Sequence, residues 1–305
     1  MSANKSVVLV TGGAGAIGSA IVESLLNTKN HEYLVRVYDS DEYAIWRLQQ
    51  RHKGNKNIRF LMGSVREYAR IKEAMYGADY IIHCAAYKHV ALCEYNPFDA
   101  VETNVIGTQN TIRAAFETRT IKKLLYISTD KAVNPTSLMG ATKLIGERLV
   151  LAANYIKGTR EIQLSIVRFP NVIQTRGNVF EAWENQLKTN GQIQVTDPAM
   201  TRYFIPIERA VEFVMESFHY MKGGEIFIPG GFEKHLRKVI DVAKEWLDQQ
   251  SQKGEIIISK PEFGEKFHEA LYTEAEAPLV KQVSPTLTVI RHPRYDFVKW
   301  EQSEE

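Results

Sequence analysis

The sequence lacks the features that mark a secreted or membrane-spanning protein. Its only two cysteines, Cys84 and Cys93, provide neither a disulfide framework nor the ligand spacing of a metal site. We therefore expect a reducing compartment, two buried thiols and no metal. No apolar run is long enough to cross a bilayer or to act as a signal segment, and the chain enters its first apolar stretch at Val7. These absences predict a cytoplasmic protein that is complete at its start.

The sequence also lacks an excess of charge of either sign. Its formal net charge is +2, with 24% charged and 44% hydrophobic residues, which is typical of soluble globular proteins. This balance favours neither nucleic acid nor an anionic membrane as a partner. The 305 residues exceed the size at which a single core usually stops growing, roughly 250 to 300 residues, so we expect one large domain and a smaller lobe.

A glycine-rich turn follows the first apolar stretch. The run from Val7 to Val10 is typical of a buried parallel strand, and TGGAGAIG comes directly after it, followed by an amphipathic helix. This order brings backbone amides and a helix amino terminus to a pyrophosphate, although a tight turn without a ligand is the alternative. It predicts a dinucleotide site at Gly12, Gly15, Ala16, Ile17 and Gly18.

The second strand predicts which dinucleotide binds. The stretch from Tyr33 to Tyr38 is apolar and ends at Asp39. An acidic side chain there can accept the ribose hydroxyls and would repel a 2′-phosphate, so we expect NAD. Arg47 on the following helix keeps NADP as the alternative.

Two further strands extend the pattern. One leads to Ser64 and Val65, and the next, which ends at His83, leads to Ala85, Ala86 and Lys88. Such alternation of strand and helix builds a doubly wound parallel sheet. We expect these loop residues at the cofactor, with Lys88 also meeting the substrate, and we expect His83 and His89 to be structural.

Asn104 stands among apolar residues of a helix predicted from Pro97 to Glu117. A buried amide must find hydrogen-bond partners. We therefore expect Asn104 to order the cofactor site from behind.

The stretch LLYISTDKAVNPTSLMGATK is the centre of the chain. An apolar strand ends in Thr129, Asp130 and Lys131, and polar side chains at the carboxyl end of a parallel strand face the ligand crevice. Met139 and Lys143 are four residues apart, so they share one helical face. An adjacent hydroxyl, acid and ammonium indicate proton transfer, with a polar loop and a helix cap as the alternative.

Three motifs resemble one enzyme family. TGGAGAIG, CAAYKHVALCEYNPFDAVETNVIGTQN and YISTDKAVNPTSLMGATK are similar to the extended short-chain dehydrogenase/reductase superfamily, and within it to the inverting UDP-N-acetylglucosamine 4,6-dehydratases. VRFPNVIQTRGNVFEAW, VTDPAMTRYFIPIERAV and FGEKFHEALYTEAEA follow in family order, and the TDK triplet separates the chain from retaining dehydratases. We expect a dinucleotide-binding domain over 1–168, rejoined by 205–230, and a nucleotide-sugar lobe over 169–204 and 231–305.

The resemblance implies a three-stage reaction on a tightly bound, recycled cofactor. Hydride leaves sugar C4, water is lost across C5 and C6, and the hydride returns to C6, with inversion at C5. The product is UDP-2-acetamido-2,6-dideoxy-beta-L-arabino-hex-4-ulose. Asp130 donates to the departing hydroxyl if it is protonated, and Lys131 takes the C5 proton if burial destabilises its ammonium. Thr129 bonds the C4 oxygen and Lys143 binds the nicotinamide ribose.

The chain departs from the superfamily pattern at Met139, where a tyrosine usually precedes the lysine by four residues. A thioether cannot take the proton of the C4 hydroxyl. Our hypothesis is that Asp130 or Lys131 takes it, directly or through water. A second departure, Asp39–Ser40 in place of serine–arginine, also favours NAD.

The resemblance also implies the substrate residues and partners. Arginine suits phosphate, so Arg176 and Arg202 are expected on the diphosphate together with Asn171, and Thr196 near the uracil. The remaining expected substrate residues are Lys88, Met139 and Glu269. We expect a homo-oligomer, a dimer or hexamer, formed through the helices after Glu94 and after Met139. Two other functions stay open: a UDP-sugar 4-epimerase and a non-catalytic dinucleotide-sensing protein.

Overall fold

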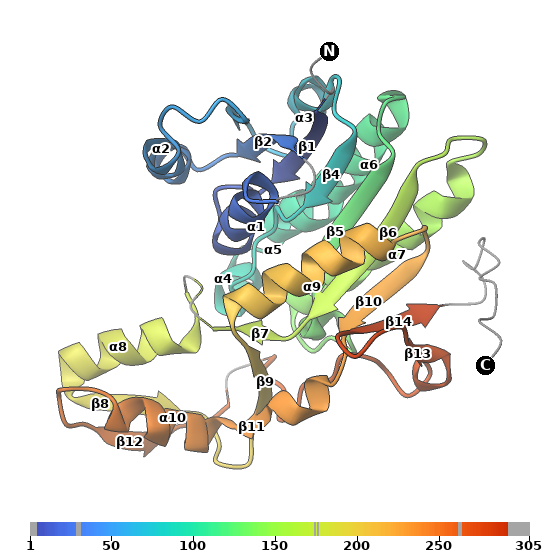
Figure 1. Ribbon diagram of the computed structural model, residues 1–305. Coiled ribbons are helices and arrows are strands. Elements are labelled where there is room, and N and C mark those ends of the chain that lie inside the picture. Colours follow the sequence, from blue (N-terminus) through green and yellow to red (C-terminus); the bar gives the residue numbers. More distant parts are fainter. Residues whose placement is uncertain (1–4, 29–31, 174, 176, 262–263, 292–305) are drawn as a thin grey trace.

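The computed structural model describes residues 5–28, 32–173, 175, 177–261 and 264–291 (Figure 1). Its body is a nine-stranded sheet in the order β13-β14-β10-β6-β5-β4-β1-β2-β3. The strands are β1 (Ser6–Thr11), β2 (Tyr33–Asp39), β3 (Ile58–Met62), β4 (Tyr80–His83), β5 (Lys123–Thr129), β6 (Gln163–Phe169), β10 (Glu225–Pro229), β13 (Val280–Gln282) and β14 (Leu287–Arg291). Seven adjacent strands of this sheet, β10-β6-β5-β4-β1-β2-β3, run parallel to one another. The direction of winding reverses at β1, which pairs with both β2 and β4, so a ligand crevice is expected at its carboxyl end.

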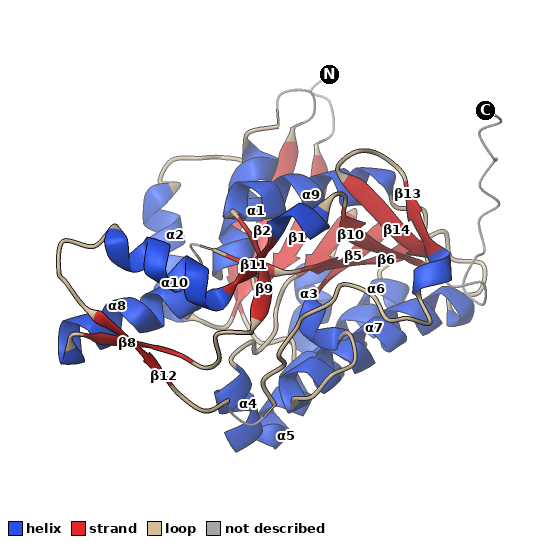
Figure 2. Cartoon of the chain, turned by 90° about the horizontal axis from the view of Figure 1, so that it is seen from below, coloured by secondary structure: helices blue, strands red, loops and turns tan. Residues whose placement is uncertain are grey.

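Helices cover both faces of this sheet. The helices α1 (Ala16–Leu26) and α9 (Ile207–Tyr220) lie together on one face, and α3 (Tyr68–Met75), α6 (Gly107–Glu117) and α7 (Leu138–Ile156) lie on the other (Figure 2). The helix α2 (Glu42–Arg51) packs beside β2 and β3. A separate apolar cluster fills each side of the sheet. The expected doubly wound α/β fold is confirmed.

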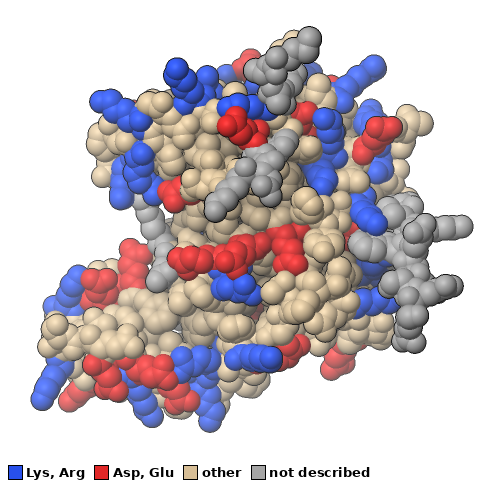
Figure 3. Space-filling view, in the orientation of Figure 1, with Lys and Arg blue, Asp and Glu red and all other residues tan. Residues whose placement is uncertain are grey.

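A smaller lobe projects from the body. It contains a three-stranded sheet of β7 (Asn171–Val172), β9 (Thr201–Ile205) and β11 (Leu236–Lys238), and a two-stranded sheet of β8 (Gln192–Val195) and β12 (Glu255–Ile258). The helices α8 (Val179–Asn190) and α10 (Val239–Asp248) pack on β8 around the buried Trp183. The surface is hollowed between the lobe and the body (Figure 3).

One part of the expected domain division is wrong. Residues 280–291, which we placed in the lobe, form β13 and β14 of the main sheet. The strand β14 runs antiparallel to β10, with Ile290 opposite Ile226. Its apolar residues are buried, so they complete the core beside β10.

The predicted helix over 97–117 is continuous but not uniform. It consists of α5 (Pro97–Val101), a π-helical turn (Glu102–Ile106) and α6, and it follows the short helix α4 (Val90–Tyr95). The π turn holds Asn104. Such wide turns are frequent at functional sites. None of the helices in the described part of the chain is both long and apolar enough to span a bilayer.

Candidate active site

The glycine turn after β1 is built for close approach. Gly12 has a φ of +64°, and a Cβ on it would lie 2.7 Å from the backbone nitrogen of Ala85. No side chain caps the amino terminus of α1 at Gly15, and the first turn of α1 contains no acidic residue. The amides at Ala16 and Ile17 therefore face no competing protein acceptor at this uncapped end, which fits a pyrophosphate.

Asp39 is held over this turn by two backbone amides. Its Oδ2 accepts a hydrogen bond from the Ala14 nitrogen (2.9 Å) and its Oδ1 from the Asp41 nitrogen (3.1 Å). The carboxylate oxygens retain lone pairs for the hydroxyls of a ribose. The chemistry of this turn therefore fits a dinucleotide without a 2′-phosphate.

Ser64 and Val65 continue the same edge of the sheet after β3. The Tyr38 hydroxyl donates to the Ser64 carbonyl (2.9 Å). Val65 is buried against Gly107, where a Cβ would lie 2.6 Å from its Cγ2. Val65 therefore supports this edge through packing.

Asn104 acts on the loop after β4. Its Oδ1 accepts from the Tyr87 nitrogen (2.8 Å), and its Nδ2 donates to the Tyr87 carbonyl (3.0 Å) and to Thr142 Oγ1 (2.9 Å). The side chain therefore holds the loop that carries Ala85, Ala86 and the exposed Lys88. These bonds agree with the expected ordering of the cofactor site from behind, and direct contact of Asn104 with a cofactor stays a prediction.

His83 is structural, as expected. Its Nδ1 lies 2.6 Å from Thr11 Oγ1 and its Nε2 lies 3.1 Å from Thr108 Oγ1. Burial lowers the pKa of His83 to about 3. The imidazole therefore stays neutral and ties β1 and β4 to α6.

Asp130 is the buried acid at the tip of β5. Its side chain is 0% exposed, and its Oδ1 accepts from Thr129 Oγ1 (2.8 Å) and from Lys131 Nζ (3.1 Å). Burial raises the pKa of Asp130 to about 6, with Lys131 acting against the rise and Glu269 adding to it. Asp130 can therefore hold a proton near neutral pH, as our hypothesis required.

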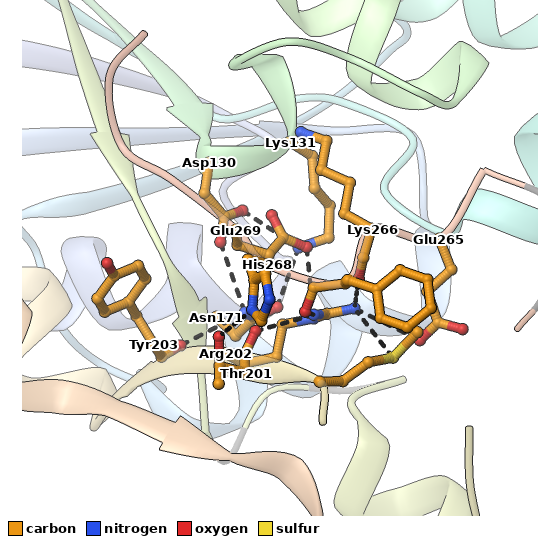
Figure 4. Close-up of polar contacts among 12 residues, drawn as sticks. Asp130, Lys131, Asn171, Thr201, Arg202, Tyr203, Glu265, Lys266, His268 and Glu269 are labelled. Atoms are coloured by element: carbon orange, nitrogen blue, oxygen red, sulfur yellow. Dashed lines mark hydrogen bonds and ion pairs between the residues drawn. The ribbon is translucent and has the colours of Figure 1, made fainter. Parts of the chain in front are cut away.

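Lys131 differs from our expectation. Its Nζ contacts Asp130 Oδ1, Asn171 Oδ1 (3.0 Å) and Glu269 Oε1 (3.2 Å), so three acceptors surround an ammonium that has three donors (Figure 4). Burial lowers its pKa, but the charges of Asp130 and Glu269 outweigh burial and the pKa is raised. Burial therefore does not make Lys131 a free amine, because the two carboxylates favour its ammonium form.

Lys143 and Met139, which stand four residues apart on α7, contact different neighbours. Lys143 donates to the Ile127 carbonyl (2.6 Å) and lies 4.1 Å from the centroid of the Tyr126 ring. Burial lowers the pKa of Lys143 to about 8. Met139 is 3% exposed and belongs to an apolar cluster with Cys93 and Ala100. Contact between Met139 and a substrate therefore stays a prediction.

A cavity of about 470 Å³ lies between the lobe and the acid–amine pair, by which we mean Asp130 and Lys131. Arg202 Nη2 lies 3.4 Å from Glu265 Oε1, and Arg202 Nε lies 3.5 Å from Glu269 Oε1. The lining residues include Lys131, Ser137, Trp183, Gln186, Thr196, Arg202, Lys266 and Glu269. Asn171 also reaches Asp130 (Nδ2 to Oδ2, 3.5 Å), so it joins the acid–amine pair. Arg176, expected on the diphosphate, lies outside the described residues.

Several functional candidates were missed by the sequence reasoning. Ser137 caps α7 through the Gly140 nitrogen (3.2 Å) and lines the cavity, and a serine directly before a helix could have signalled this. Lys266 was expected in the substrate lobe but was given no role in the site. Trp183 and Gln186 share one face of α8, but no sequence signal separates such residues from an ordinary amphipathic helix.

Comparison with known proteins identifies the family. A family model described as polysaccharide biosynthesis protein matches residues 8–290. A relative named as an uncharacterized membrane protein from Methanocaldococcus jannaschii is 44% identical over 273 residues, which are 88% of this chain and 81% of that protein.

Two relatives with named activities have the same sequence identity to this chain. The inverting UDP-N-acetylglucosamine 4,6-dehydratase of Campylobacter jejuni is 34% identical over 294 residues, 94% of this chain and 85% of that enzyme. The UDP-glucose 4-epimerase of Rickettsia rickettsii is 34% identical over 275 residues, 88% of this chain and 78% of that enzyme. Identity alone therefore does not separate the two reactions.

Solved structures share the fold over most of their length. The structure of Pen from Bacillus thuringiensis superimposes with a TM-score of 0.88 at 37% identity, covering 96% of this chain and 90% of Pen. DesIV of Streptomyces venezuelae, a dTDP-glucose 4,6-dehydratase with NAD bound, gives a TM-score of 0.76 at 23% identity, covering 87% and 88% of the two chains. This chain belongs to the polysaccharide biosynthesis protein family and has the doubly wound fold of the short-chain dehydrogenase/reductase dehydratases and epimerases.

Proposed function

We propose that this chain is a nucleotide-sugar-modifying enzyme, and specifically a UDP-N-acetylglucosamine 4,6-dehydratase that inverts C5. The observation that carries the proposal is the buried carboxyl of Asp130, with a pKa of about 6, hydrogen-bonded to Lys131 beside a cavity. Loss of water across C5 and C6 needs an acid for the departing hydroxyl and a base for the C5 proton. An adjacent carboxyl and amine supply both.

The two groups can exchange their roles along one hydrogen bond. With Asp130 ionised and Lys131 charged the pair is an ion pair, and transfer of one proton over the 3.1 Å contact gives a carboxylic acid and a free amine. The acid then protonates the C6 hydroxyl and the amine removes the C5 proton. Lys131 can thus act as the base although its resting form is the ammonium.

The cofactor is proposed to be NAD, held by the glycine turn and by Asp39. When bound, NAD supplies the acceptor for the C4 hydride and the donor that returns it to C6. Asp39 accepts the ribose hydroxyls, and its charge disfavours a 2′-phosphate. Lys143, which is buried beside Tyr126, is proposed to bind the nicotinamide ribose. Mass analysis of the cofactor carried by the purified protein tests NAD against NADP.

Incubation with UDP-N-acetylglucosamine in deuterated water tests the reaction. The proposal expects loss of one water, a 4-keto product, and deuterium at C5 with inverted configuration. A product that retains the C6 oxygen would refute the dehydratase assignment.

A UDP-sugar 4-epimerase is the second candidate. The equal identity of the Rickettsia rickettsii epimerase favours it. The same incubation separates the two, because epimerisation at C4 leaves C5 unlabelled and the mass unchanged. A non-catalytic dinucleotide-sensing protein would bind cofactor and change neither sugar.

We also propose a homo-oligomer that forms through α4, α5 and α7. Tyr95 and Phe98 are 86% and 83% exposed, and Leu92, Ile145 and Ile156 are exposed as well. Large exposed apolar patches mark interaction surfaces. Light scattering of the parent and of Phe98→Glu tests this, and a monomeric parent would refute it.

A further inference from the structure

Two carboxylates compete for the same ammonium at the tip of β5. Lys131 Nζ lies 3.1 Å from Asp130 Oδ1 and 3.2 Å from Glu269 Oε1. The two acids arrive from different parts of the fold, because Asp130 directly follows β5, whereas Glu269 follows His268, which is bridged to Thr201 of β9. Figure 4 shows the two side chains approaching the lysine together. Lys131 therefore contacts two carboxylates when both acids are ionised, and Arg202, with its Nε 3.5 Å from Glu269 Oε1, adds a second positive charge on the Glu269 side only.

The two carboxylates are not equally satisfied. Asp130 Oδ1 accepts from Thr129 and Lys131, whereas Glu269 Oε2 is buried and has no hydrogen-bond partner among the described residues. Glu269 is only 6% exposed, and a buried polar atom without a partner calls for an explanation. Simple anchoring of the chain would use both oxygens. We therefore look to the negative charge of Glu269, and not to its hydrogen bonds, for its role in the site.

We propose that Glu269 is a positioning residue that keeps Lys131 charged in the resting site and thereby makes Asp130 the group whose ionisation sets the proton content of the pair. This role rests on the proposed dehydratase function and differs from the sugar contact that the family resemblance implies for Glu269. In this role Glu269 influences how many protons Asp130 and Lys131 hold and does not contact the sugar.

The charges around the pair support this order of titration. Asp130 faces Lys131, Glu269 and Lys266, and Lys131 also faces Arg202 and Lys88. Lys131 and Arg202 together hold the pKa of Glu269 below its ordinary value against the effect of burial. Asp130 has one cationic contact and is fully buried, so a proton added near neutrality goes to Asp130. Without Glu269, Lys131 would serve Asp130 alone, and Asp130 would stay ionised.

The test is the titration of Asp130 in Glu269→Gln, followed by the carboxylic-acid band in infrared difference spectra. Asp130→Asn identifies the band. We expect Glu269→Gln to move the midpoint of the band's titration, and with it the acidic limb of kcat, to lower pH. If the midpoint falls by about one pH unit, the protonated fraction of Asp130 at neutral pH falls about tenfold. Glu269→Asp retains the charge and should restore much of the parent titration.

Glu265→Gln is the matched control. Glu265 also lies on the cavity and contacts Arg202 (3.4 Å), but no ion pair with Lys131 is present among the described residues. It should leave the Asp130 titration where the parent has it.

The outcomes separate this proposal from the function on which it rests. An unchanged titration in folded Glu269→Gln, with a raised KM alone, would overturn it and restore the sugar-contact role. If Glu269→Gln does not fold, Glu269→Ala decides, because it also removes the charge, and an unmoved Asp130 titration in that variant refutes the proposal. If the parent forms no dehydrated product but the titration still moves, the proposed function fails while the electrostatic role stands.

Discussion

At the scale of single residues, the pKa of Asp130 links the stability of the folded protein to the proposed chemistry. Its pKa rises from 3.8 to about 6 on folding, so the folded chain binds this proton more tightly than the unfolded chain. Stability is therefore fully present below about pH 4 and falls as the pH rises through about 6, by about 3 kcal/mol in all. The proposed catalytic acid thus costs stability at neutral pH.

Asp130→Asn tests this coupling. An uncharged amide of the same shape avoids the cost of burying a carboxylate. We expect the free energy of unfolding to rise by up to about 3 kcal/mol above pH 6, to change little at pH 4, and turnover to be lost. Urea unfolding of both proteins between pH 4 and pH 8 measures it. A variant that is less stable than the parent at pH 8 would contradict the assignment.

Met139 provides a second test at the same scale. It is buried against Cys93 and Ala100, and its thioether cannot accept a proton. Met139→Leu conserves volume, so we expect a loss of less than about 1.5 kcal/mol of stability and substantial remaining turnover. Lys131→Ala, assayed beside it, should lose turnover. Near-complete inactivation of Met139→Leu at unchanged stability would implicate the methionine in the chemistry.

At the scale of elements, the junction of β1 and α1 makes the sharpest prediction. A Cβ at Gly18 would lie 2.1 Å from the Gly12 carbonyl oxygen, whereas one at Gly15 would lie 3.2 Å from it. Backbone must move in the first case and only slightly in the second. We expect Gly18→Ala to lower the melting temperature and NAD affinity strongly, and Gly15→Ala to keep the parent's melting temperature within a few degrees. Calorimetry with and without NAD measures both, and equal melting temperatures for the two variants would show that the turn yields.

The elements also show what the sequence could and could not predict. The strand, glycine turn and helix at the amino terminus were predictable, because short-range spacing determines them. The place of β14 was not, because its pairing with β10 joins residues about sixty positions apart, as Ile226 and Ile290 illustrate. The contact of Asn171 with Asp130 likewise depends on where β7 pairs with β9. The protonation of Lys131 could not be read from the TDK triplet, since Glu269 comes from the distant end of the chain.

At the scale of the whole molecule, a buried ionic network ties the carboxyl-terminal part of the chain to the main sheet. Arg168 on β6 bonds Glu147 on α7 (Nη2 to Oε2, 2.7 Å) and Glu276 in the loop before β13 (Nη1 to Oε2, 3.0 Å). Ser128, directly before Thr129, donates to the same Glu147 (2.5 Å). The end of β5 and the segment that carries Glu269 are thus linked through one guanidinium.

Arg168→Met tests whether this network joins the two parts. Removal of one partner from a buried ion pair costs about 3 to 5 kcal/mol, because the remaining charge is left uncompensated. Arg168→Met leaves Glu147 buried without its counter-charge, so we expect a loss of that size at pH 7. Adding Glu147→Leu removes the uncompensated charge and should recover part of the stability. We expect turnover of the double variant to stay below that of the parent, because Ser128, beside Thr129, has then lost its hydrogen-bond acceptor. Urea unfolding and turnover of the single and double variants measure this, and equal stability of Arg168→Met and the parent would show that the sheet alone holds the carboxyl-terminal segment in place.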